Sequence, residues 1–253
     1  MNRDWVDMTT VLCAQSLAKA AAPGGRGSVA GVIVVELEGA RVAFTERSDG
    51  SVGRTDPAVE VESPAEVAAD RARVAGECGI APENVLRGRQ VHGPDVRVGR
   101  AGDPDDVEAD GQATGDPAAA VCVHVADCLP VILAESSTVA ALHGGWRGLH
   151  AGIVERGVAQ LNDAANAQAV IGPGIGPCCF QVGDEVREAF AEFDAEVEDR
   201  IDLPLVAEKL LNAQGVTDVR HTRLCTACDP RFFSHRRDGS KTGRQMALAW
   251  LTA

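Results

Sequence analysis

The sequence predicts a mixed α/β protein, either α+β or a layered α/β architecture, and three observations support this class. Apolar residues alternate in short runs, as in Val121, Val123 and Val125, at the period of two that a strand imposes. Other stretches, such as 151–161, place apolar residues at helical spacing. Strands and helices then follow one another without the regular alternation of a βαβ chain.

Length and composition limit the domain organisation and the partners of the chain. The 253 residues suffice for a single large domain, and we expect residues 1–30 to be an extension and 31–253 to form that domain. The 37 acidic and 24 basic residues give a net charge of -13, which disfavours nucleic acid or an anionic membrane surface as a partner. The chain is compatible with a monomer or a homodimer.

Cysteine usage and apolar runs indicate the compartment. Eight cysteines in a chain of this length fit reduced thiols better than a disulfide framework. No apolar run approaches the roughly 20 residues of a membrane-spanning helix. The N-terminal stretch does not resemble a signal peptide, so the cytoplasm is the expected location.

The first predicted element of the domain is a hairpin. The stretch 31–46 reads as two strands joined through Glu38-Gly39, where a turn needs a positive φ. The second strand leads to Arg47. Residues 48–62 are polar and contain glycine, which predicts a loop.

A helix and two short strands are predicted next. Ser63-Pro64-Ala65-Glu66 is a capping box with proline at the first helical position, and Gly79 supplies the stop. A strand candidate at 85–91 ends in His92-Gly93, and another begins at Val96. The acidic segment 102–110 is predicted to be a solvated loop.

The stretch 121–148 organises the chain. A strand meets Asp127-Cys128-Leu129-Pro130, where the proline is expected to interrupt the ladder. A later apolar run delivers His143 into a glycine loop, and Arg147 follows at a strand-to-helix corner. Such a corner has free backbone amides and the positive end of a dipole, which favours an anion.

The remaining elements are shorter. Residues 169–171 predict a strand that enters a GPGIGP loop, with a helix beginning near Asp184. An amphipathic helix is expected to start at Asp202. Residues 216–224 offer a strand, and the apolar run 246–251 follows near the C-terminus.

Three residues form a candidate metal site. Two imidazoles and a thiolate, from His92, Cys128 and His143, suit zinc and leave a fourth tetrahedral position for water or substrate. They are separated by 36 and 15 residues, which is not a local metal-binding spacing. Spacing alone therefore favours a structural role, with the histidines closing strand ends and Cys128 packing as a small hydrophobe.

Neighbouring polar residues have less certain roles. Asp127 could orient a ligand histidine as an outer acceptor, whereas His124 is better interpreted as an ordinary interior or surface histidine. The adjacent pair Cys178-Cys179 follows glycines, and both structural packing and catalysis stay open for it.

Two further motifs occur near the C-terminus. The pair Cys225 and Cys228 forms a CxxC, which we interpret as a turn because no second CxxC completes a zinc ribbon. Arg236 and Arg237 are candidate contacts to an anionic substrate, and position alone does not choose between them.

Five blocks of the chain resemble the bacterial laccase-domain family, also described as zinc-dependent purine nucleoside phosphorylases and as peptidoglycan editing factors. The resemblance covers roughly residue 41 to the C-terminus. The blocks, in order, are QVHG at 90–93, ADCLP at 126–130, LHGGWRG at 142–148, GPGIGPCCFQVGDEV at 172–186 and LCTACDPRFFSHRRDGSKTGRQ at 224–245.

This resemblance implies a fold, a metal and an activity. The fold would be a four-layer α/β/β/α sandwich with mixed sheets, and zinc would bind His92, Cys128 and His143. The activity would be phosphorolysis of adenosine, inosine, guanosine or methylthioadenosine, together with adenosine deamination. Corner position and resemblance together suggest Arg47 and Arg147 for phosphate or ribose.

Other functions stay open. Copper polyphenol oxidases need several metals and many histidines, whereas this chain has six histidines and no HxH, so copper is the less favoured metal. Cys128 with His143 as base could act as a hydrolase that edits a peptidoglycan precursor, or the zinc site could do so. The remaining hypothesis is a non-enzymatic protein that binds a cell-wall or division partner.

The chain departs from the family in one segment. Relatives usually carry a longer glycine-rich segment with a Ser-Leu-Asn-Leu element, whereas this chain has SDGSVGRTDPAVEV at 48–61. That difference bears on the substrate pocket.

Overall fold

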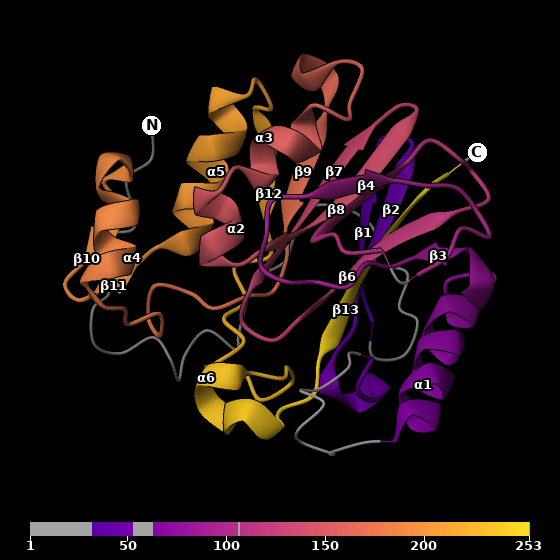
Figure 1. Cartoon of the computed structure of the whole chain (residues 1–253), viewed down its shortest axis with the longest axis horizontal. Coiled ribbons are helices and arrows are strands. Elements are labelled where there is room, and N and C mark those ends of the chain that lie inside the picture. The colour runs from indigo at the N-terminus through magenta and orange to yellow at the C-terminus, as the bar shows by residue number, and fades with distance from the viewer. Residues whose placement is uncertain (1–31, 53–62, 106, 253) are drawn as a thin grey trace.

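Two β-sheets packed face to face form the centre of the molecule, and helices cover their outer faces (Figure 1). The structure is a computed structural model that describes residues 32–52, 63–105 and 107–252. The predicted extension 1–30 and most of the predicted loop 48–62 lie outside the described residues.

The first sheet has the strand order β1-β2-β13-β6-β3. The bounds are Ile33–Leu37 (β1), Ala40–Phe44 (β2), Gln245–Leu251 (β13), Ala120–Val125 (β6) and Val85–Leu86 (β3). The predicted hairpin is confirmed, with Gly39 at φ 74° in its turn. The strand predicted at 85–91 is wrong in length, because only two of its residues pair with β6.

The second sheet has the strand order β12-β9-β7-β8-β5-β4. The bounds are Asp218–His221 (β12), Gln168–Ile171 (β9), Leu129–Glu135 (β7), Thr138–Gly144 (β8), Gly111–Thr114 (β5) and Val96–Val98 (β4). A separate small hairpin consists of β10 (Glu196–Val197) and β11 (Arg200–Ile201).

The chain passes from the first sheet to the second between β6 and β7. Asp127 lies in this short connection with φ 89°. Pro130 does not interrupt the ladder as predicted, because it lies in β7 opposite His143 and its carbonyl accepts a hydrogen bond from the Gly172 amide at 2.9 Å. Its missing donor is tolerated because the pairing of β7 with β9 begins only at Val131.

The helices are six α-helices and several 3-10 turns in the described residues. The α-helices are α1 (Pro64–Glu77), α2 (Trp146–His150), α3 (Ile153–Val158), α4 (Asp184–Ala189), α5 (Leu203–Ala213) and α6 (His235–Asp238). The helix predicted over 151–161 is shorter than expected, because α3 begins at Ile153 and Gly152 with φ 94° separates it from α2. The capping box of α1 and the start of α5 at Asp202 are confirmed.

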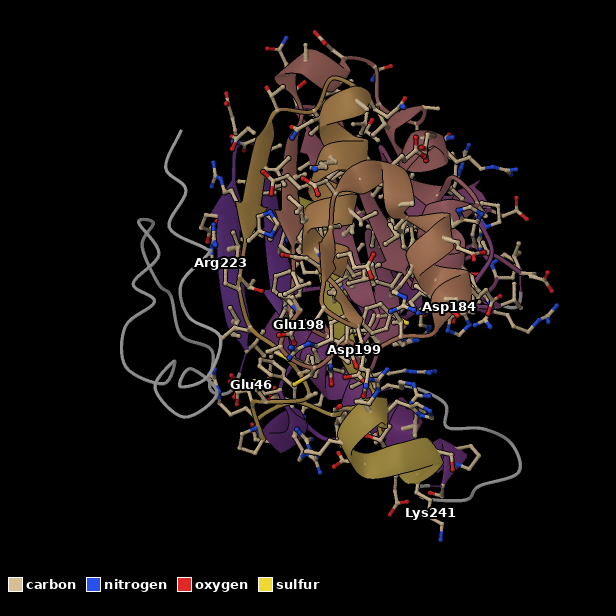
Figure 2. The ribbon with its side chains drawn as sticks, turned by 90° about the vertical axis from the view of Figure 1, so that its left-hand side faces the viewer. Glu46, Asp184, Glu198, Asp199, Arg223 and Lys241 are labelled. Atoms are coloured by element: carbon tan, nitrogen blue, oxygen red, sulfur yellow. The ribbon has the colours of Figure 1, made fainter. Side chains whose placement is uncertain are left out.

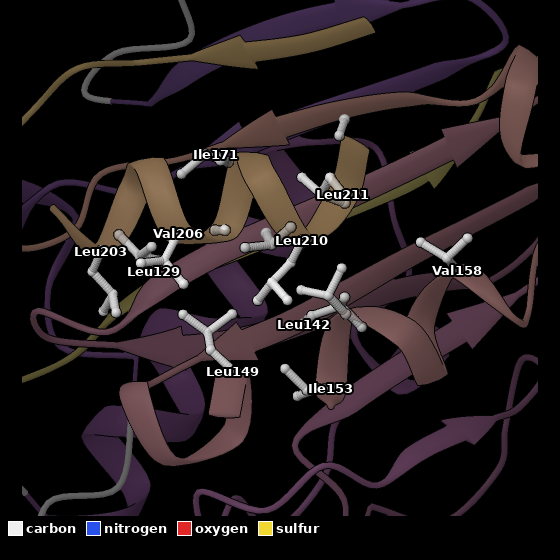
Figure 3. Close-up of a cluster of buried hydrophobic side chains, with 14 of the residues drawn as sticks. Leu129, Leu142, Leu149, Ile153, Val158, Ile171, Leu203, Val206, Leu210 and Leu211 are labelled. Carbon is white, nitrogen blue, oxygen red and sulfur yellow. The ribbon is translucent and has the colours of Figure 1, made fainter. Parts of the chain in front are cut away.

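Three hydrophobic clusters correspond to the three boundaries of a four-layer α/β/β/α sandwich. One cluster fills the space between the sheets, with Val121 and Val123 facing Ile132 and Val170. A second lies between the second sheet and α2, α3, α4 and α5 (Figure 3). The third packs α1 on the outer face of the first sheet. The predicted mixed α/β class and its layer order are confirmed.

None of the helices in the described ranges has both the length and the apolar character that a membrane crossing requires.

Candidate metal centre

The three predicted ligands come together although each lies on a different segment. One ligand atom from each of His92, Cys128 and His143 lies within 4.8 Å of the other two. Cys128 lies in the connection between the sheets and His143 near the end of β8, while His92 lies in the loop after β3. His92 is exposed, Cys128 is half-buried and His143 is buried, so the group is open to solvent on one side.

The loop that carries His92 is fixed by the carboxylate of Asp110. The backbone amides of Val91, His92 and Gly93 donate to this carboxylate at 2.8, 2.9 and 2.9 Å. His92 has φ 63°, an unfavourable value for a residue with a side chain. The three hydrogen bonds therefore hold a strained conformation that directs the imidazole.

Asp110 also orients the second imidazole. Its Oδ1 lies 2.6 Å from His143 Nδ1, which leaves Nε2 as the ring nitrogen available to a metal. The side chain of Asp110 is fully buried, so the predicted solvated loop 102–110 is wrong at this residue. The free-energy cost of burying this carboxylate is offset because three backbone amides and an imidazole donate hydrogen bonds to it.

Charges within the group reinforce one another. Burial raises the pKa of the Cys128 thiol, but the charge and hydrogen bond of His143, together with His92, lower this pKa to about 6. Burial lowers the pKa of His143, but the Cys128 charge and the hydrogen bond that His143 donates to Asp110 raise it to about 9. The thiol is thereby held in the thiolate form that metals bind.

A glycine two residues after His143 leaves space for the group. A Cβ on Gly145 would lie 3.0 Å from His92 Cδ2 and 3.1 Å from Cys128 Sγ. Any larger residue at this position would displace a candidate ligand.

Asp127 does not play the orienting role considered for it. Its Oδ1 accepts from Thr226 Oγ1 and its Oδ2 from the Arg236 amide, both at 2.6 Å. The carboxylate therefore connects the loop containing Cys128 to the C-terminal region, while Asp110 holds the histidines.

The two predicted anion-binding arginines differ in surroundings. Arg147 is exposed on α2, with its guanidinium 4.4 Å from the ring centroid of Trp146. Arg47 lies in a 3-10 turn after β2, bound to Asp238 at 2.5 Å and 4.7 Å above the Phe233 ring. A surface hollow of about 420 Å³ includes Arg47, and Arg147 is not among its lining residues.

The other arginines of the C-terminal block mainly hold loops. Arg236 donates to the carbonyls of Cys179 and Gln181, each at 2.9 Å. Arg237 donates to the carbonyls of Thr226 and Phe232 at 2.9 and 2.7 Å. The guanidinium of Arg236 is thus committed to backbone acceptors, and that of Arg237 to backbone acceptors and the Asp238 carboxylate.

Arg244 is a residue that sequence reasoning missed. Burial lowers the pKa of its guanidinium, while the charges of Cys128 and Asp127 raise it, which places a cation near the candidate metal centre. It precedes β13, and only the strand pairing of β13 with β6 brings it to this region.

The donor set fits zinc. Two imidazoles and one thiolate are zinc ligands, and three protein ligands leave an open coordination position. The carboxylate behind His143 and the space left by Gly145 are consistent with that fit. The residues that would hold the ion are His92, Cys128 and His143.

The fold and this site together define a layered α/β protein with a solvent-accessible candidate metal centre of two histidines and a cysteine. The chain belongs to the family described as multi-copper polyphenol oxidoreductase laccase, whose model matches residues 41–252. The family predicted from the five sequence blocks is confirmed.

Several bacterial relatives are named purine nucleoside phosphorylases. One from Pseudomonas aeruginosa is 40% identical over 177 residues, which cover 64% of this chain and 72% of the relative. YfiH of Escherichia coli is 36% identical over 204 residues, covering 75% and 83%. A relative from Streptomyces coelicolor is 33% identical over 235 residues, covering 85% and 97%.

Solved structures share the fold. A Neisseria meningitidis protein superposes with a TM-score of 0.76 at 28% identity, covering 88% of this chain and all of that one. YlmD from Geobacillus stearothermophilus also has a TM-score of 0.76, at 26% identity, covering 85% and 93%.

Proposed function

We propose that the chain is a zinc-dependent purine nucleoside phosphorylase that also deaminates adenosine. The observation that carries the proposal is the open trio of His92, Cys128 and His143, held by Asp110. The names of the relatives support an enzyme that acts on purine nucleosides and phosphate.

The proposed phosphorolysis joins phosphate to ribose. A phosphate oxygen attacks C1′ of the nucleoside, the bond from C1′ to the base breaks, and its electron pair leaves with the purine, which then takes a proton. Zinc supplies Lewis acidity for this chemistry and for attack of water on C6 in deamination. The products are a free purine and ribose 1-phosphate in the first reaction, and inosine and ammonia in the second.

The chain's own residues hold the reactants. Arg147 is exposed and follows Gly145 by two residues. A Cβ added at Gly145 would contact His92 and Cys128, so the Arg147 guanidinium lies near the trio and is suited to bind phosphate. Arg47 is the second candidate for phosphate or ribose, in competition with Asp238. Asp110 keeps the proton on His143 Nδ1.

Adenosine incubated with and without phosphate tests the proposal. We expect adenine only with phosphate, and inosine in either case, when the products are separated by chromatography. The His92→Ala variant should lose at least 100-fold in both products, because removal of one of three ligands empties the site. His150→Ala, which removes an exposed histidine on α2, is the control and should retain activity.

The alternatives predict different results. Several copper ions per chain would favour the oxidase that the family description names, although only one of the two metal-ligand clusters among the described residues contains histidine. An active, metal-free protein that loses activity when Cys128 is alkylated would favour the hydrolase. A zinc-loaded protein that leaves adenosine unchanged would leave precursor editing or partner binding as the function.

A further inference from the structure

Four cysteines that the proposed nucleoside site does not use form a second cluster. Cys178 and Cys179 follow β9, and Cys225 and Cys228 follow β12. Because β9 and β12 are parallel neighbours, the loops after them leave the same edge of the second sheet. The four sulfur atoms all lie within 4.8 Å of one another, and none of the four cysteines forms a disulfide.

Two tight turns direct both sulfurs of each pair to the same place. In the first turn, the amides of Cys179 and Phe180 donate to the Gly176 carbonyl, each at 3.0 Å. In the second, the Asp229 amide donates to the Cys225 carbonyl at 2.9 Å. The turn predicted for the CxxC motif is therefore present, and its partner is the adjacent pair rather than a second CxxC.

The sulfur separations suit a metal ion. The Cys228 sulfur lies 3.4 Å from that of Cys178 and 3.3 Å from that of Cys179. A tetrahedral zinc ion with bonds of about 2.3 Å to sulfur needs ligand sulfurs about 3.8 Å apart. The two separations are about 0.4–0.5 Å shorter than this value and all others are below 4.8 Å, so small side-chain adjustments would complete the coordination.

Backbone donors already surround one of the sulfurs. The Gly176 amide donates to Cys225 Sγ at 3.3 Å, and the amides of Ala227 and Cys228 also donate to it. Three N–H donors around one sulfur stabilise a thiolate and are the outer contacts that tune metal–thiolate sites.

Two arginines lie next to the cluster, where four thiolates and a divalent cation would leave a net negative charge, although Arg200 also pairs with Glu198 and Asp199. Arg236 donates to the Cys179 carbonyl at 2.9 Å and Arg200 to the Cys178 carbonyl at 3.4 Å. Arg200 belongs to the hairpin whose turn carries Glu198 and Asp199, on the face shown in Figure 2. That hairpin lies beside the first loop, because the Val182 amide donates to the Asp199 carbonyl at 3.1 Å.

We propose that Cys178, Cys179, Cys225 and Cys228 bind a structural zinc ion as four thiolates. The set is closed, with four protein ligands, unlike the open trio. The ion joins the loop after β9 to the loop after β12. Both loops also bind Asp127, through the Ile175 amide on its carbonyl at 2.7 Å and Thr226 on its carboxylate. The second ion therefore positions the segment that carries Cys128.

Zinc content per chain tests the proposal. Protein purified under reducing conditions should contain two zinc ions, measured by elemental analysis. Cys225→Ser/Cys228→Ser should lose half of this zinc and keep the ion at the trio, whereas His92→Ala/His143→Ala should lose the other half. Cys78→Ser is the thiol control, because Cys78 caps the C-terminus of α1 and belongs to neither group of candidate ligands, and it should retain two ions.

A measurement on the unaltered chain remains decisive if the double serine variant fails to fold. Cobalt added to metal-free protein should bind in two equivalents, one of which shows the intense thiolate-to-metal absorption of a four-sulfur site. Binding of one cobalt ion with the weak absorption of a single thiolate would overturn the proposal. A disulfide between the two pairs in freshly purified, reduced-buffer protein, seen by peptide mass, would overturn it as well.

Discussion

Asp110 contributes to the candidate metal centre without being a ligand. Its carboxylate accepts hydrogen bonds from three backbone amides of the His92 loop and from Nδ1 of His143. One carboxylate therefore sets the positions of two ligands. Burial raises its pKa, but the hydrogen bond from His143 and the amides lower it, with a net lowering. The group is therefore ionised and acts as an acceptor at neutral pH.

Replacement of this carboxylate should weaken metal binding. We expect Asp110→Asn to lower zinc affinity by about 10- to 100-fold, because an amide accepts fewer of these hydrogen bonds and does not fix the histidine tautomer. Competition with a chromophoric chelator measures the change. Asp116→Asn is the matched control, since Asp116 also accepts backbone amides, from Ala101 and Ala118, but contacts neither ligand histidine. Equal zinc affinities in the two folded variants would contradict the role given to Asp110.

The sequence predicts the residues of the candidate site only where they lie inside a recognisable motif. His92, Cys128 and His143 were found because each lies in a recognisable block, whereas their separations gave no signal. Asp110 was missed because it follows several other acids, and only its place before β5 buries it. The sequence predicts only a turn at Cys225 and Cys228. Their partner cysteines lie about 50 residues earlier and come close to them only through the pairing of β9 with β12.

At the scale of elements, β8 connects the site to the core. It ends with His143 and Gly144, while Leu142 points to the opposite face and packs below α3 (Figure 3). A Cβ on Gly157 would lie 2.5 Å from Leu142 Cδ1, so helix and strand are in close contact here. The same strand thus anchors a ligand and a helix.

Truncation of this side chain should be costly. We expect Leu142→Ala to lower the free energy of unfolding by about 2–5 kcal/mol, because the closely packed helix cannot collapse fully into the cavity. Urea unfolding followed by circular dichroism measures the change. Val98→Ala is the control, since Val98 is 63% exposed and its loss should change stability by at most about 0.5 kcal/mol. Similar midpoints for both variants would show that Leu142 is not a core residue.

Strands and helices could be predicted from the sequence where neighbouring residues alone determine them. The alternation in 121–125 and the capping box before α1 are local, and both elements are present. The helix that apolar periodicity predicts from residue 151 begins only at Ile153, because Gly152 has a positive φ that periodicity does not report. The sequence predicts that Pro130 interrupts the ladder, yet its missing donor is harmless because β7 pairs with β9 only from Val131 onward.

At the scale of the whole molecule, β13 completes the first sheet. It lies between β2 and β6 and pairs with both, so the last described strand is joined to one near the start of the described chain and to one from its middle. Ala247 and Ala249 face the second sheet within the central cluster, where small side chains let the sheets approach. The order of these layers could not be derived from local sequence, because it depends on which distant strands pair.

A charge placed in this central layer should therefore disrupt the whole fold. We expect Ala249→Asp to lower the free energy of unfolding by more than about 4 kcal/mol or to abolish the cooperative transition, because a carboxylate between two apolar faces finds no partner. The loss should be smaller at low pH, where the buried carboxyl is protonated, because its pKa in the folded protein would be raised and the unfolded chain would ionise first as pH increases. Urea unfolding at two pH values measures both effects. Ala68→Asp, on the exposed side of α1, introduces the same charge without burial and should leave the midpoint nearly unchanged. A midpoint for Ala249→Asp equal to that of Ala68→Asp would mean that the two sheets are not packed through β13.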